Sequence, residues 1–206
     1  MEPVIEFIFR WAHVLFGIVW IGMLYYFNFV QTEYFKEAEA NAKADAVKKL
    51  APRALWWFRW GAMFTFITGL YLFHKIGALQ VVQPAIYMGA LAGTFMFLNV
   101  WLIIWPNQQV VIGLKQGDGA ASAAKAGLAS RTNTLLSGPM LFGMLASKHL
   151  PMALSDGFGL WLCLGLIVAL EANALFGKLG PMASVKGVIH CSIALTAAIW
   201  AILAFL

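Results

Sequence analysis

The residues WAHVLFGIVWIGMLYYFNFVQ, Trp11 to Gln31, form an apolar run that contains one histidine, His13. The hydrocarbon core of a bilayer is about 30 Å thick, and a helix needs about 20 residues to cross it. Only helices and closed barrels satisfy their backbone polar groups there, and an uninterrupted run favours a helix. The stretch therefore predicts a transmembrane helix with an imidazole in its apolar part.

The whole chain has the composition of an integral membrane protein. Of its 206 residues, 62% are hydrophobic and 11% are charged, whereas soluble domains are roughly half apolar and a quarter charged. The first apolar run does not resemble a signal peptide, because Glu2 and Glu6 replace the basic start and the run continues to Tyr25 and Tyr26. We expect it to remain in the mature chain.

The pattern of apolar segments predicts an all-α fold, an integral membrane bundle of about six transmembrane helices in a single domain, 1–206. Between the first two spans, an Ala-, Lys- and Glu-rich segment predicts a surface helix that stops at Pro52, and Lys115–Gly127 predicts a flexible loop. The predicted spans are Pro3–Gln31, Arg53–His74, Pro84–Trp105, Arg131–His149, Gly157–Phe176 and Val185–Leu206.

Positive charge is concentrated in the first, third and fifth loops and their flanks, which hold most of the 14 lysines and arginines. Loops rich in these residues face the cytoplasm. The sequence therefore predicts a multi-pass protein of the bacterial inner membrane with both termini in the periplasm. The basic residues do not form one stripe, so the net charge of +5 does not indicate a nucleic-acid partner.

The two cysteines, Cys163 and Cys191, both lie in apolar segments. They offer no disulfide framework and no CxxCH motif for covalent haem attachment. We therefore expect no cytochrome c domain in this chain, and any c-type haem must belong to another chain.

Four histidines lie in or at the ends of four different predicted spans: His13, His74, His149 and His190. Ionisable groups in hydrocarbon cost several kcal/mol and usually have a partner. One such histidine is commonly a packing residue, but four in so apolar a chain favour ligation. No helix carries the HxxxH pair that suits zinc or copper, whereas haem needs one or two axial imidazoles and apolar walls.

Depth in the membrane separates the four histidines. His13 is near the middle of its span, His74 and His149 are at the periplasmic surface, and His190 is about a turn inside the cytoplasmic end. The hypothesis is a non-covalent haem b with His13 as an axial iron ligand, its other ring nitrogen held by a neighbouring polar group. Because of its depth in the membrane, His190 ranks first as the opposite axial ligand of the iron.

Two charged residues accompany these histidines. Arg10 lies one turn from His13 on the same helix face, where it would neutralise a haem propionate or simply reach the membrane surface. Glu171 is the one acid well inside a predicted span, at a depth similar to His190. It would orient His190 from outside the ligand shell or extend to the cytoplasmic interface.

Several stretches resemble the membrane domain of the bacterial membrane-bound urate oxidase (urate hydroxylase) family. They are WAHVLFGIVWIGMLYYFNFVQ, PRALWWFRWGAMFTFITGL, FLNVWLIIWPNQQVVIG and SRTNTLLSGPMLFGMLASKH, with EANALFGKLG compatible. The resemblance implies a multi-helix membrane unit, often followed by a periplasmic cytochrome c domain that accepts electrons. His149 closes the segment most similar to the family, which ranks it second as the opposite ligand, ahead of His74.

A weaker similarity links His13, followed seven residues later by Trp20-Ile21-Gly22, to the haem-binding membrane protoporphyrinogen oxidases. It also implies haem at the histidine of the first helix.

Three functions remain open from the sequence. The first is a haem b redox protein that passes electrons toward a periplasmic cytochrome c, alone or within a larger redox complex in the lipid bilayer. The second is an oxidoreductase that acts on urate or another purine with a separate cytochrome c. The third is a structural or assembly subunit of a membrane complex.

Overall fold

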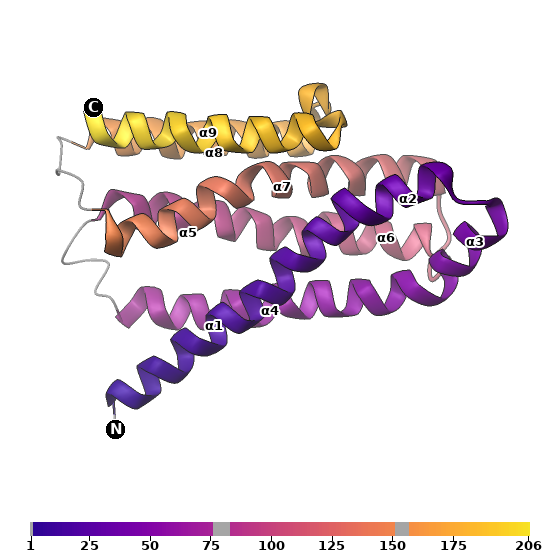
Figure 1. Ribbon diagram of the computed structural model, residues 1–206, viewed down its shortest axis with the longest axis horizontal. Coiled ribbons are helices and arrows are strands. Elements are labelled where there is room, and N and C mark those ends of the chain that lie inside the picture. The colour runs from indigo at the N-terminus through magenta and orange to yellow at the C-terminus, as the bar shows by residue number, and fades with distance from the viewer. Residues whose placement is uncertain (1, 76–82, 151–156) are drawn as a thin grey trace. The chain divides into compact units, whose positions relative to one another are not determined.

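The computed structural model describes residues 2–75, 83–150 and 157–206. These residues form helices, and none of them forms a strand, so the fold is all-α (Figure 1). Several helical stretches are long and apolar enough to cross a membrane: Glu2–Glu37, Pro84–Val111, Phe158–Phe176 and Val185–Phe205.

Most helices follow the predicted spans, but the helix of the fourth span begins at Gly119, well before the predicted Arg131. Three π-helical segments (η1, η2 and η3) interrupt otherwise α-helical runs, and η4 is a short 3-10 turn. The elements are α1 (Glu2–Tyr25), η1 (Tyr26–Gln31), α2 (Thr32–Glu37), α3 (Ala40–Asp45), η2 (Ala46–Leu50), α4 (Ala51–Lys75), α5 (Pro84–Leu98), η3 (Asn99–Ile104), α6 (Trp105–Val111), α7 (Gly119–His149), α8 (Phe158–Phe176), η4 (Gly180–Ala183) and α9 (Val185–Phe205).

The predicted second and fourth spans correspond to α4 and α7, which are long helices but less apolar than the four stretches above. Polar residues of α7 are buried in the protein. Asn133, fully buried, donates from Nδ2 to the Met96 carbonyl at 2.9 Å, and Ser137 Oγ donates to the Thr134 carbonyl at 2.8 Å. Such bonds lower the cost of polar groups in an apolar environment.

The prediction that the surface helix stops at Pro52 is wrong. The chain breaks earlier, at Ala38 and Glu39, whose ψ angles of 140° and 149° are extended. The helix then resumes at Ala40 and continues through Pro52 into α4. Proline has no N–H to donate within a helix. The π-helical turn η2, which ends at Leu50, changes the hydrogen-bond pattern just before Pro52.

The prediction of a flexible loop over Lys115–Gly127 is wrong from Gly119 onward, because α7 begins at that residue. Asp118 caps the helix: its Oδ1 accepts the backbone N–H groups of Ala120 and Ala121 at 2.9 and 3.0 Å. The alanines that follow have the highest helix propensity of any residue. A good cap and strong helix formers outweigh the small, polar character of this stretch.

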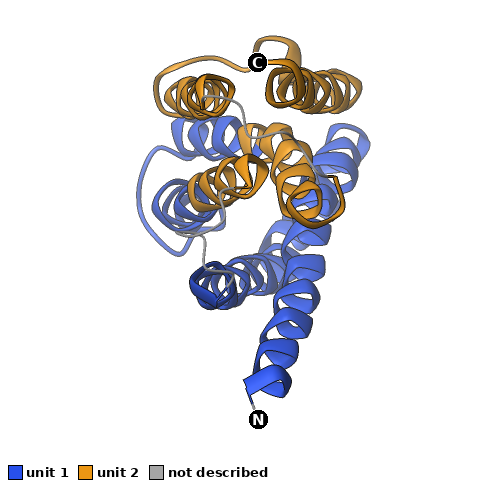
Figure 2. Ribbon diagram, turned by 90° about the vertical axis from the view of Figure 1, so that its left-hand side faces the viewer, with its two compact units in different colours: residues 1–76, 97–130 blue, residues 77–96, 131–206 orange. Residues whose placement is uncertain are grey.

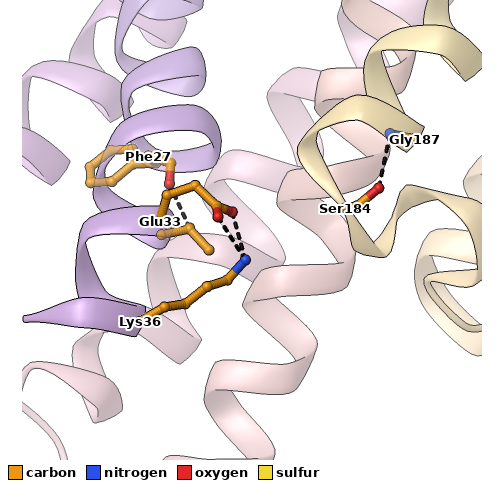
Figure 3. Close-up of polar contacts among 6 residues, drawn as sticks. Phe27, Glu33, Lys36, Ser184 and Gly187 are labelled. Carbon is orange, nitrogen blue, oxygen red and sulfur yellow. Dashed lines mark hydrogen bonds and ion pairs between the residues drawn. The ribbon is translucent and has the colours of Figure 1, made fainter.

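The chain divides into two compact units (Figure 2). The first unit contains residues 1–76 and 97–130 and is built on the antiparallel pair α1 and α4. Two aromatic pairs join these helices, Phe9 with Tyr71 and Phe16 with Phe64, and Phe27 of the following segment η1 contacts Phe58 of α4. At one end of the pair, Lys75 Nζ lies 2.7 Å from Glu2 Oε1. Near the other end, in α2, Lys36 pairs with Glu33 at 2.7 Å (Figure 3).

The second unit contains residues 77–96 and 131–206. Within it α5 and α7 cross at glycines: a Cβ added to Gly89 would lie 3.1 Å from the backbone of Gly143. Helices α8 and α9 lie side by side, with Ile167 and Ile199 buried (Figure 1). Ser184 caps α9 by accepting the Gly187 N–H at 3.0 Å (Figure 3).

Candidate functional site

Helix α1 places the His13 side chain against α4. His13 Nδ1 lies 2.9 Å from the backbone carbonyl oxygen of Thr65 and 3.2 Å from Thr68 Oγ1. The two threonines are buried, and the histidine itself is half-buried. The imidazole therefore has a fixed polar contact on the neighbouring helix.

This contact determines the tautomer of His13. A backbone carbonyl oxygen only accepts hydrogen bonds, so Nδ1 must carry the proton and donate it to Thr65. In the neutral ring the lone pair is then on Nε2. No residue in the described part of the chain is hydrogen-bonded to Nε2. This is the arrangement of histidines that bind a metal through Nε2, whose other nitrogen donates to a carbonyl or carboxylate.

Gly69 allows the ring to lie this close to α4. A Cβ added at Gly69 would lie 3.0 Å from His13 Cε1 and 3.4 Å from His13 Nδ1. Both separations are below the optimum of about 3.5 to 4.0 Å for carbon contacts. A larger residue at this position would displace the imidazole from Thr65.

Aromatic contacts lie about one helical turn on each side of His13. Phe9 stacks on Tyr71 with ring centroids 3.9 Å apart, and Phe16 contacts Phe64 at 4.9 Å. Each pair joins α1 to α4. The two pairs hold the helices in the register that brings His13 opposite Thr65.

Arg10 is exposed and forms an ion pair with Glu6, one turn away on α1. The guanidinium is thus on the same helix as His13 and has a carboxylate partner already. Its expected contact with a haem propionate remains a prediction.

The other three histidines are exposed at helix ends or surfaces. His74 is in the last turn of α4, His149 is the last residue of α7, and His190 is on α9. Among the described residues, no group of three or more His, Cys, Asp and Glu side chains is placed to hold a metal ion. His74 belongs to the same unit as His13, and the other two belong to the second unit.

Glu171 is buried on α8, with 8% of its surface exposed. Its role toward His190, which is exposed on α9 in the same unit, remains a prediction.

A family model described as urate oxidase N-terminal matches residues 82–204, more than half of the chain. The chain belongs to the urate oxidase N-terminal family. The resemblance expected from the sequence is therefore confirmed. No curated protein matches the chain, and no solved structure does.

The urate oxidase N-terminal match includes the WPNQ and RTNT segments, and with them Glu171, His149 and His190. It begins after the residues of the His13 contact, which all lie between His13 and Gly69. The family assignment and the geometry around His13 are therefore independent observations on different parts of the chain.

Sequence reasoning identified His13 but missed the residues that hold it. Thr65, Thr68 and Gly69 have the spacing i, i+3 and i+4, which places them on one face of α4. A face made of two threonines and a glycine was the available signal for a histidine partner.

Proposed function

We propose that this chain is a haem b-binding integral membrane redox protein that passes electrons toward a c-type cytochrome on the periplasmic side of the bacterial inner membrane. The observation that carries the proposal is the state of His13, with Nδ1 bonded to Thr65 and Nε2 left with its lone pair. In this state Nε2 is able to donate its lone pair to a metal, which supports the proposal.

The contacts of His13 support its proposed role as a haem ligand. The Thr65 carbonyl fixes the orientation of the ring, fixes the tautomer and makes Nε2 a better donor. Gly69 leaves room for that orientation. Bound haem supplies one-electron transfer, with a potential tuned by its axial ligands and by burial. Arg10 would neutralise a propionate by exchanging its Glu6 partner.

For the opposite axial position we rank His190 first, His149 second and His74 third. Glu171 is proposed to orient His190. In the proposed topology six helices cross the membrane, both termini are periplasmic, and the cytochrome partner is on that same side.

A second candidate function is an oxidoreductase that oxidises urate or another purine and delivers the electrons to a separate cytochrome c. The observation that favours it is the family match over residues 82–204. In both proposals haem b is the redox group, and they differ in the electron donor.

The experiment begins with a pyridine haemochrome assay of the purified protein, together with its reduced-minus-oxidised spectrum. We expect a haem b spectrum. Anaerobic addition of urate then separates the two functions, because only a urate oxidase reduces its own haem on that addition. A well-folded protein without a Soret band, even after haem is added, would contradict both proposals and leave the structural or assembly role.

A further inference from the structure

Arg59 is a cation within α4 that has an aromatic contact instead of an acidic partner. Its guanidinium carbon lies 3.9 Å from the ring centroid of Trp105, the first residue of α6. The side chain is half-buried, and no carboxylate of the described residues is within ion-pair distance of it. An arginine inside a predicted membrane span is costly and generally has a function.

A second hydrogen-bond donor without an acceptor belongs to the same helix contact. The indole Nε1 of Trp101 is buried and has no hydrogen-bond partner among the described residues. The ring of Trp101 packs edge-on against Trp60, with centroids 5.6 Å apart. Trp60 follows Arg59 in the chain, and Trp101 precedes Trp105 by four residues, so both contacts join neighbouring residues of α4 to the segment from Trp101 to Trp105.

An oxyanion would accept hydrogen bonds from both donors. A guanidinium held on an indole face keeps its N–H edge free, and that edge matches an oxyanion with two parallel hydrogen bonds. The cation–π contact with Trp105 compensates only part of the desolvation of Arg59, since such contacts contribute about 0.5 to 2 kcal/mol. It provides no acceptor for the N–H of Trp101. A buried donor without an acceptor costs about 1 to 3 kcal/mol.

Trp101 also lies in the π-helical segment η3, Asn99–Ile104. π-Helical turns inside α-helices are rare and occur frequently at functional sites. We propose that Arg59 and Trp101 form a binding site for a phosphate-type oxyanion, supplied either by the headgroup of an anionic phospholipid or by a soluble phosphate. This site is separate from His13 and does not depend on haem.

The test uses full-length protein, delipidated in detergent, with two probes. Native mass spectrometry measures the binding of phosphatidylglycerol, with phosphatidylcholine as the zwitterionic comparison. Isothermal titration measures the binding of inorganic phosphate. The variants are Arg59→Gln, which removes the charge, and Trp101→Phe, which keeps the ring and removes the N–H. Arg53→Gln is the matched control, because Arg53 is an exposed arginine on the same helix.

We expect Arg59→Gln to weaken binding of one probe by about tenfold or more, as for a hydrogen bond to a charged group. Trp101→Phe should weaken it by about threefold to tenfold, and Arg53→Gln by about twofold or less. A loss of binding restricted to phosphatidylglycerol identifies a lipid headgroup as the ligand, and a loss of binding restricted to phosphate identifies a soluble ligand. If Arg59→Gln does not fold, the binding of the two probes to Trp101→Phe tests the proposal instead. Wild-type protein that binds neither probe, or variants that bind both as wild type does, would overturn the proposal.

Discussion

Replacement of Gly69 by alanine tests the geometry around His13 with a single methyl group. The new Cβ would lie 3.0 Å from His13 Cε1 and 3.4 Å from Nδ1. Ordinary carbon contacts are about 3.5 to 4.0 Å, so the ring must retreat by about half an ångström. The Nδ1 to Thr65 distance of 2.9 Å would then pass the upper limit of about 3.2 Å for a good N–H···O bond.

The expected effect on stability is small because two terms oppose each other. Overpacking costs about 1 to 3 kcal/mol, and alanine gains about 1 kcal/mol over glycine in helix propensity. We expect net destabilisation of about 0 to 2 kcal/mol. The effect on haem affinity should be larger than the effect on stability, because disturbing the partner of a metal-bound histidine lowers metal affinity by about 10- to 100-fold.

Haem titration of the apo-protein, followed at the Soret band, measures the affinity, and denaturant titration measures the stability. Gly22→Ala is the matched control, since nothing lies within 4 Å of a Cβ added at this α1 position. In a His13→Ala background the added methyl meets no imidazole, so Gly69→Ala should there be neutral or stabilising. If Gly69→Ala has the haem affinity of Gly22→Ala and the same effect on stability in both backgrounds, the reasoning is refuted.

Three further predictions concern topology and helix packing. In intact cells, an impermeant maleimide should label a cysteine at position 2 (Glu2→Cys) and should not label one at position 119 (Gly119→Cys). The opposite pattern would mean that the topology is inverted. Asp118→Ala should destabilise the start of α7 by about 1 kcal/mol, seen as faster amide exchange in its first turn, and unchanged exchange would contradict the capping role. Gly143→Ala should destabilise the protein by about 1 to 3 kcal/mol in denaturant titration, because its Cβ would lie 2.5 Å from a backbone oxygen of α5. Gly127→Ala, on the same helix with nothing within 4 Å, is the control, and equal stability of the two variants would count against the close crossing.

The sequence predicted the apolar helices well because long apolar runs have few alternative structures. It failed where the local signals were mixed. The stretch after Asp118 is small and polar, as in many loops, but it follows a good cap and is rich in alanine. Pro52 looked like a helix end, yet a π-helical turn precedes it and the helix continues. Composition alone does not distinguish these outcomes.

The candidate site was also predicted only in part from the sequence. A histidine among apolar residues predicted that His13 needs a polar partner, and Thr65 provides it. Which residue would do so depends on the register of α1 against α4, which the aromatic pairs set through contacts between distant parts of the chain. The contact of Arg59 with Trp105 was unpredictable for the same reason. A pairing of His13 with a histidine of the second unit remains a prediction.

The most direct measurement of the central claim is the haem content of His13 variants by pyridine haemochrome assay. We predict that wild-type protein binds haem b and that His13→Gly, although folded and inserted, loses it. Imidazole added to His13→Gly should restore haem binding and the reduced spectrum, because it supplies the missing axial nitrogen. A folded His13→Gly protein that keeps full haem content and an unchanged reduced spectrum without imidazole would contradict the assignment of His13 as an axial ligand.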